Sequence, residues 1–380
     1  MPDPNNFAMT RFGGAAGTSS VRSPRGAVRL NGLVIEGWES WEVENNAFRA
    51  ADSFTVVFAA ALLPPDFGPN WFGAQTAILA EIFASADASA HSADPASYQP
   101  SLADRLILGQ VDDIAFDPLR GTVALTGRDL TARLIDTRTS SGYLNQTSSM
   151  IAAVLAGHHD LMPVITETTT PIGTFYSQNH ISLTQERSEW DILTELAGFE
   201  NFDAFVLGDE LHFEPRPDPG TAERYVIDWQ QGDTTSSAPT ANVAALRLER
   251  SLTLARGVSV TVTSWHARQG KRFAATWPKM DADAPAPQTS PLAYSFIAPG
   301  LTQDQCQQVA QARYEDIAQH MVRLNAEMPG DDMLDCRMIV SIQGTDTAWD
   351  QDYVPDAVRR TMSAEGGYRM TLSAKNISTV

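Results

Sequence analysis

The sequence has only two cysteines, Cys306 and Cys336, in 380 residues. They form no disulfide framework, and neither lies in a CxxC or Cys/His spacing typical of zinc sites. We expect two reduced thiols, with Cys306 buried on the apolar face of a helix. Lysine and arginine are also scarce, 27 against 46 Asp and Glu, which gives a formal net charge of −19. This balance argues against a protein that grips nucleic acid or an anionic membrane, although DNA could slide past such a surface without sticking.

Long apolar runs are missing too. No run approaches ~18 residues, and the N-terminal stretch lacks the apolar core of a signal peptide. We therefore expect no membrane anchor and synthesis in a cytoplasm. Hydrophobic residues make up 43% of the chain, which is typical of a globular protein, and its length suits two or three domains.

Catalytic motifs are absent as well: there is no HExxH, no GxSxG, no Walker loop and no GxGxxG after a strand. His158–His159–Asp160 follows the helix-ending Gly157, which favours a surface turn over a metal site. Other polar pairs occur at Asp112–Asp113, Asp331–Asp332, Asn179–His180 and Asp209–Glu210. Among 46 acidic residues such pairs are expected by chance. We therefore predict no enzyme and no cofactor, and we name no catalytic, cofactor-binding or metal-binding residue.

The N-terminal third of the chain is β-rich after a polar start. Residues 1–26 are rich in Gly, Ser and Asn and are predicted to form a flexible arm. Residues 27–139 contain about six short apolar runs separated by turn signals, which predicts an antiparallel barrel or sandwich. The clearest turn is Asn31–Gly32, a strong hairpin signal, and the run 77–84 fits a strand in this context.

Residues 140–238 have a different texture, and we expect them to form an inserted α/β domain. Thr147 or Ser148 can cap one helix, and Ser188 can cap a second. A tight hairpin is predicted about Gly208–Asp209. Its expected facing apolar residues are Phe205 and Leu207, matched by Leu211 and Phe213.

Residues 239–380 return to β texture and predict a second barrel. Residues 258–266 alternate strictly, and the five prolines within 278–300 predict a long loop. Thr302 and Gln305 form a capping box for a helix expected over 301–326 and packed on this barrel. The predicted fold class is thus mainly β, with two β-barrels in one chain and an α/β insertion, as a duplicated domain would give.

The C-terminal run GTDTAWDQDYVPDAVRRTMSAEGGYRMTLSAKN, residues 344–376, is similar to the ending of phage tail baseplate hub proteins of the late control protein D family. It departs from that pattern at Arg359–Arg360, where the family often has a His. Residues 128–161 and 187–215 resemble two further family units in the same order, so the resemblance spans about 27–376. The matching C-terminal positions are Gly344, Thr345, Thr347, Trp349, Asp350, Tyr353, Val358, Gly366, Gly367 and Tyr368.

This resemblance implies two tail-tube-like β-barrels per chain and three copies in a ring of six barrels. Such a ring joins a sixfold tail tube to a threefold spike or tip in the virion tail and lets DNA pass. The implied partners are two further copies, a tail-tube or distal tail protein, a spike, fibre or tip protein, a tape-measure protein and DNA as transient cargo.

The same fold forms the N-terminal part of type VI secretion spike proteins. Because this chain ends at Val380, directly after the last strand, we expect any spike to be a separate polypeptide. One alternative is the hub of an injection or secretion apparatus without a virion. An alternative from another class is a tail-associated cell-wall hydrolase.

Overall fold

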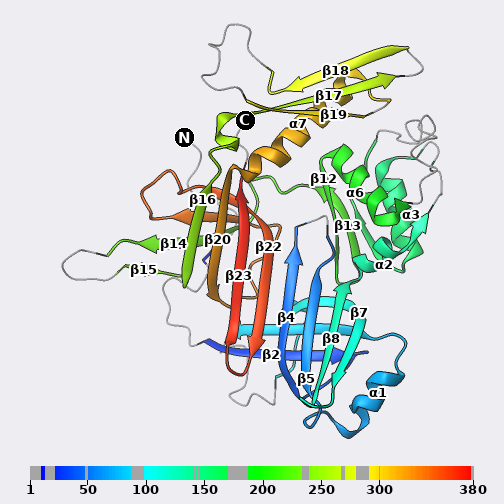
Figure 1. The fold of residues 1–380 in the computed structure, drawn as a ribbon, viewed down its shortest axis with the longest axis vertical. Coiled ribbons are helices and arrows are strands. Elements are labelled where there is room, and N and C mark those ends of the chain that lie inside the picture. The colour runs from blue at the N-terminus through cyan, green and yellow to red at the C-terminus, as the bar shows by residue number, and fades with distance from the viewer. Residues whose placement is uncertain are drawn as a thin grey trace.

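The structure is a computed structural model that describes residues 10–12, 22–47, 50–87, 98–139, 143, 146–169, 187–232, 239–266, 270–279, 291–298 and 300–377. It is mainly β, and fifteen strands join into one continuous sheet. Two β units share this sheet, an α/β module lies beside them, and a small sheet with one helix lies at the far end of the long axis (Figure 1). Within the described residues, no helix is both long and apolar enough to cross a membrane.

The first β unit begins at Arg22, five residues before its expected start at residue 27, because β2 pairs with β6 from that point. Its hairpin turn is the predicted one: Asn31 and Gly32 both have positive φ, 50° and 82°, as a tight turn requires. The run 77–84 falls largely in strand β6, as predicted. The unit comprises β2 (Arg22–Leu30), β3 (Leu33–Val34), β4 (Trp38–Asn46), β5 (Ser53–Ala59), η1 (Pro65–Phe67), α1 (Pro69–Ala74), β6 (Leu79–Asp87), η4 (Leu102–Asp104), β7 (Arg105–Asp117) and β8 (Thr122–Asp129).

The second β unit draws on strands from both ends of the chain. Its strands are β1 (Thr10–Phe12), β14 (Arg224–Gln230), β15 (Thr240–Ala241), β16 (Ala245–Arg250), β20 (Val322–Pro329), β21 (Ile339–Gln343), β22 (Asp352–Ser363) and β23 (Gly367–Asn376). β14 lies within the segment assigned to the insertion, 140–238, yet it pairs with β21 along its length. Strand pairing therefore moves the end of the insertion from 238 to before Arg224.

The α/β module packs three helices and a small sheet around a shared apolar core. Its last helix, Glu189–Glu200, has the predicted Ser188 capping box. The predicted faces of the hairpin were wrong, because the two-residue turn pairs Phe205 with His212. The residues that share the core face with Leu211 and Phe213 are therefore Ala204 and Val206. The module comprises α2 (Thr131–Asp136), β9 (Arg138–Thr139), α3 (Ser148–His158), β10 (Met162–Ile165), β11 (Arg187–Ser188), α6 (Glu189–Glu200), β12 (Phe202–Leu207) and β13 (Glu210–Pro215).

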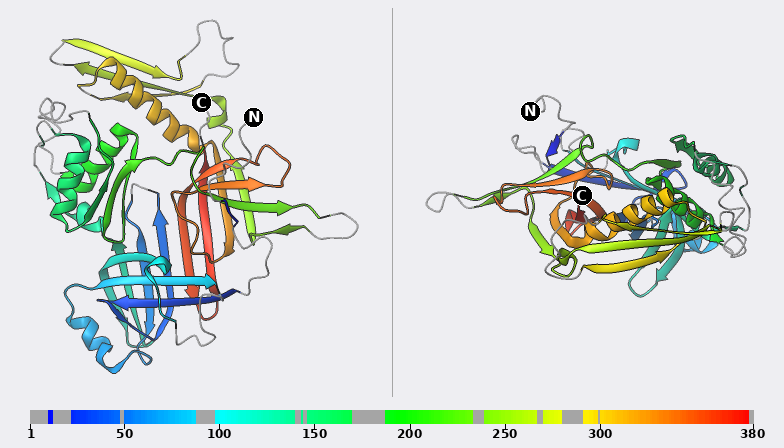
Figure 2. Two further views of the ribbon diagram at one scale, coloured as in Figure 1. Left: turned by 180° about the vertical axis from the view of Figure 1, so that it is seen from behind. Right: turned by 90° about the horizontal axis from the view of Figure 1, so that it is seen from above.

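The small sheet and its helix at the far end of the long axis, here called the outer layer, depart most from the prediction. The helix with the Thr302–Gln305 capping box ends at Ala318, because residues from Val322 onward pair as strand β20. It covers a separate three-stranded sheet rather than a barrel (Figure 2). One strand of that sheet, β19, lies in the expected long loop 278–300. The layer comprises η5 (Leu254–Arg256), β17 (Val258–His266), β18 (Lys271–Trp277), β19 (Leu292–Ile297), α7 (Gln303–Ala318) and η6 (Gln319–Met321).

Candidate assembly surface

The two β units are joined by direct strand pairing between β4 and β22, from Ser40↔Ser363 to Asn46↔Ala357. The joint creates an antiparallel run in the order β16-β20-β23-β22-β4-β5-β8-β7 (Figure 1). Apolar packing crosses the joint too, since Met362 and Tyr368 of the second unit lie in the core of the first. The two units are therefore one continuous layer.

The two halves of this run repeat one topology. In chain order, the first half is β4, β5, β7, β8 and the second is β16, β20, β22, β23. In both halves the first strand pairs with the second, the second with the fourth, and the fourth with the third, always antiparallel. A fifth strand, β6 or β21, then pairs with the third. This identity of order indicates an internally duplicated unit.

Both ends of the run are open. Beyond Val111, whose backbone still donates to the Ile78 carbonyl, β7 pairs with β8 alone among the described residues, and β16 pairs there only with β20. An open strand edge offers unpaired backbone donors and acceptors to a further strand. Within the described residues, the run therefore ends in an open edge at each side, β7 at one side and β16 at the other.

The face of the run that points away from the two cores is polar and carries charge of both signs. Ion pairs cross neighbouring strands on it, with N···O distances of 2.7 Å for Arg128–Asp112, 2.6 Å for Arg359–Glu42 and 3.0 Å for Lys375–Asp356. Despite the net charge of −19, this face has no field of a single sign.

A buried polar cluster lies under the joint. The Arg360 guanidinium is 4% exposed and donates to the carbonyl oxygens of Asp331 (2.7 Å) and Leu334 and to Asn45 Oδ1 (2.9 Å). Asp52 accepts hydrogen bonds from Asn45 Nδ2 and from the Asn46 backbone, both at 2.7 Å. These contacts tie the loop before β21 to the first β unit.

The buried Asp129 and the partly buried Asp52 line a cavity of about 120 Å³ beside this cluster. Burial raises the pKa of Asp52 to about 6. Burial, together with the nearby Asp52 carboxylate, raises the pKa of Asp129 well above its ordinary value. Asp129 Oδ2 accepts from the Thr131 hydroxyl at 2.8 Å, whereas Oδ1 has no hydrogen-bond partner among the described residues. At neutral pH the folded state must either keep these groups protonated or hold them ionised away from water, and both lower the free energy of unfolding.

The sign of the pH dependence follows from these raised pKa values. The folded state holds protons on Asp52 and Asp129 that the unfolded chain releases above about pH 4, so this pair lowers the free energy of unfolding as pH rises toward 6 and beyond. We expect Asp129→Asn to raise the free energy of unfolding by about 1–3 kcal/mol at pH 7.5 and to leave it unchanged at pH 4. Urea unfolding at both pH values measures this. Asp66→Asn, at an exposed carboxylate, is the control, and equal shifts at both pH values would contradict the assignment.

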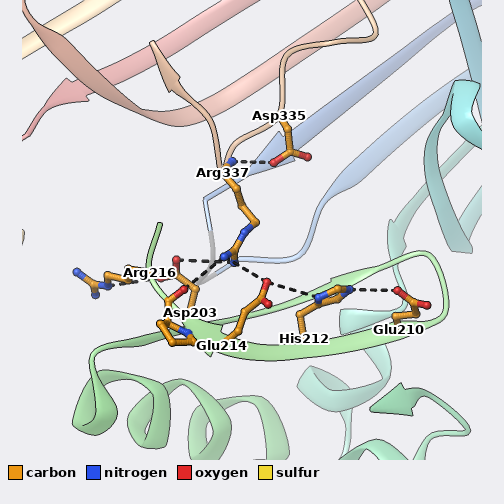
Figure 3. A network of polar contacts seen from close by, with 8 residues as sticks. Asp203, Glu210, His212, Glu214, Arg216, Asp335 and Arg337 are labelled. Atoms are coloured by element: carbon orange, nitrogen blue, oxygen red, sulfur yellow. Dashed lines mark hydrogen bonds and ion pairs between the residues drawn. The ribbon is translucent and has the colours of Figure 1, made fainter. Parts of the chain in front are cut away.

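A second polar network fastens the α/β module to the second β unit (Figure 3). Arg337, from the loop before β21, contacts Glu214 at 3.2 Å and Asp203 at 4.0 Å, both on the β12–β13 hairpin. Its guanidinium also lies 4.6 Å from the centroid of the Phe205 ring. Phe205 therefore faces Arg337 instead of the module core, which explains the reversed hairpin faces.

Most residues singled out in the sequence have structural partners. His158 and His159 do not form a free surface turn: both rings contact the buried Glu189 carboxylate, at 3.1 and 2.7 Å. This pairing links the end of α3 to the start of α6, and only the fold reveals it. The buried Asp331 accepts from the Tyr225 hydroxyl at 3.2 Å and from the Met333 backbone at 2.6 Å.

Cys306 and Cys336 are both free and buried, which agrees with two reduced thiols. Burial raises the pKa of each thiol, so neither is set up as a nucleophile. Asn179–His180 lies outside the described residues. Within the described residues, no group of three or more His, Cys, Asp or Glu side chains could hold a metal.

Neither a protein-family model nor a curated protein matches this sequence. The structure does match solved structures over most of its length. A tail protein from Neisseria meningitidis MC58 is 15% identical with a TM-score of 0.66, covering 93% of this chain and 97% of that one. The 43 kDa tail protein of prophage MuSo2 from Shewanella oneidensis is 15% identical with a TM-score of 0.62, covering 93% and 98%.

A component of the type VI secretion system of Escherichia coli matches more weakly, at 11% identity and a TM-score of 0.51, over 92% of this chain and 77% of that one. That component is described as structurally similar to tail proteins of bacteriophage T4. The chain therefore has the fold of phage tail and type VI secretion proteins. This confirms, at the level of the fold, the resemblance seen in the three sequence motifs.

Proposed function

We propose that this protein is a structural tail hub, in which three copies form a ring of six β units. The ring joins a sixfold tail tube to a threefold spike or tip and lets DNA pass. The observation that carries this proposal is the sheet run with two repeated halves, joined at β4–β22 and open at β7 and β16. A heterologous surface of this kind generates a closed ring when the rotation between copies closes.

Further features support the proposal. The chain shares its fold with phage tail proteins, which suggests a place in the virion tail and no catalytic role. The polar face of mixed charge suits a lumen through which DNA passes without being held, because it carries no single-sign field that would bind phosphates. The division into two tube-like units and an inserted module, the tube, spike and tape-measure partners, and synthesis in a host cytoplasm belong to the same proposal.

The proposal predicts a particle of three times 41.3 kDa in solution, measured by light scattering behind a sizing column. A protein that stays monomeric at high concentration and does not co-purify with the tail-tube protein of the same genome would contradict it. The similarity to a type VI secretion component favours one second candidate, the hub of an injection apparatus without a virion. Capsid and terminase genes next to this gene would support the virion, and their absence would support the injector.

A further inference from the structure

We infer that the open edge of β7 in one copy pairs with the open edge of β16 in a second copy, and that a charge pattern opposite to that of the β4–β22 joint selects this pairing. The inference rests on the proposed ring and names the surface that closes it.

The core of the first unit is incompletely covered at the β7 edge. Ile114 and Phe116 pair with Leu125 and Val123 of β8, which are fully buried in the core of the first unit. Paired residues of an antiparallel ladder point to the same face, so Ile114 and Phe116 point to the core side as well. Yet they are 36% and 49% exposed. They lie on the stretch of β7 that pairs on one side only.

The second unit shows what completes such an edge. Asp117 and Ser363 end the first strands of the two corresponding hairpins, β7–β8 and β22–β23. Counting back from these ends, Phe116 corresponds to Met362 and Ile114 to Arg360. Met362 and Arg360 are buried, because β4 of the neighbouring unit pairs with β22 there. The unit that would cover Ile114 and Phe116 in the same way is the second unit of another copy, through β16, the counterpart of β4.

The register of this contact can be transferred from the joint. In the joint, Arg359 on β22 pairs with Glu44 on β4. Arg359 lies four residues before Ser363, as Asp113 lies four before Asp117, so Asp113 takes the place of Arg359.

In the first unit, Glu44 on β4 pairs with Ser53 on β5, which in turn pairs with Arg128, six residues after the start of β8. In the second unit, Arg247 on β16 pairs with Asn325 on β20, which in turn pairs with Ser373, six residues after the start of β23. Arg247 is therefore the counterpart of Glu44. The transferred register therefore sets Asp113 opposite Arg247 and Ile114 beside Leu246.

The charges are reversed between the two contacts. The joint has a cation on β22 and an anion on β4, with Arg359 Nη2 2.6 Å from Glu42 Oε2. The inferred contact has an anion on β7 and a cation on β16. A β16 strand in place of β4 would set Arg247 against Arg359, and β4 at β7 would set Glu44 against Asp113. Like charges directly opposite are destabilising, so each edge disfavours the wrong partner.

The same charges disfavour a twofold dimer through β7, because pairing this edge with its own copy would bring together acidic side chains of both chains, among them Asp113. β16 carries charge of both signs, since Arg247 contacts Glu249 of the same strand at 2.6 Å, so its charges alone permit a β16–β16 contact. Pairing β7 with β16 joins an acidic edge to a basic side chain, and this is the heterologous contact that a ring requires.

The test uses the full chain with Asp113→Arg, Arg247→Asp and the double variant, and measures mass by light scattering over a concentration series. Each single variant is expected to weaken self-association at least about tenfold, and the double variant to restore it to near the wild-type value. Both residues are exposed in the single chain, so thermal unfolding of dilute monomers should be unchanged, which separates lost contact from lost fold. Asp66→Arg, at an exposed acid in η1, is the control for net charge.

Single variants that still form wild-type trimers would overturn this edge assignment and leave the ring in place. A double variant no better than the single variants would also overturn it. A wild-type protein that remains monomeric would overturn the proposed ring and this inference together.

Discussion

Replacing Arg360 with methionine is expected to lower the free energy of unfolding by about 3–5 kcal/mol. The guanidinium is buried and donates to two carbonyl oxygens and to Asn45 Oδ1, which would be left without these donors. It is also a positive charge close to the partly buried Asp52, whose carboxylate would lose that compensation. Methionine preserves much of the side-chain length, so the loss reports the charge and the hydrogen bonds rather than an empty space.

The neighbouring Arg359 provides a matched control on the same strand. Its side chain is 52% exposed and forms an ion pair with Glu42. Exposed pairs contribute little, so Arg359→Met should cost no more than about 1 kcal/mol. Urea unfolding of the purified monomers at pH 7.5 compares the two, and similar losses for both variants would contradict the structural role of Arg360. Sequence similarity only marked Arg359–Arg360 as a departure from a family pattern, whereas the structure gives the two arginines different roles.

Replacing Trp41 with alanine is expected to cost about 3–5 kcal/mol. The indole is 2% exposed and lies in the core of the first unit, where its ring centroid is 5.7 Å from that of Tyr368 of the second unit. Truncation would leave a cavity at the place where the two units share their core. The stability of the joint, as well as that of the first unit, should therefore fall.

Two variants test this role of Trp41. Trp41→Phe keeps an aromatic ring, and the indole Nε1 has no hydrogen-bond partner among the described residues, so this variant should lose clearly less than alanine. Trp265→Ala, at a largely exposed tryptophan on β17, should change the free energy of unfolding by less than about 0.5 kcal/mol. Circular dichroism during urea unfolding measures all three. A loss in Trp41→Ala no larger than in Trp265→Ala would show that the joint does not depend on this contact.

Local signals in the sequence predicted the parts of the fold that depend on residues close in the chain. The Asn31–Gly32 turn and the Ser188 and Thr302 capping boxes are all present. Each is decided within a few residues, by a positive φ or by one side chain that reaches a nearby backbone donor. The mainly β class with two related units was also predicted, since strand alternation and the three ordered motifs extend over most of the chain.

The pairing of distant segments was beyond the sequence. Strand β4 pairs with β22 more than 300 residues later, and β14 leaves the expected insertion to join the second unit. Such choices depend on which edges remain free once the local hairpins have formed, and a strand pattern does not record this. The same holds for the charged groups, because burial of Asp52, Asp129 and Arg360 is imposed by neighbours that the tertiary fold brings together. The sequence by itself therefore determined the local turns, the caps and most of the strands, whereas the tertiary structure decided how the edges join, which charges are buried and which edges stay open.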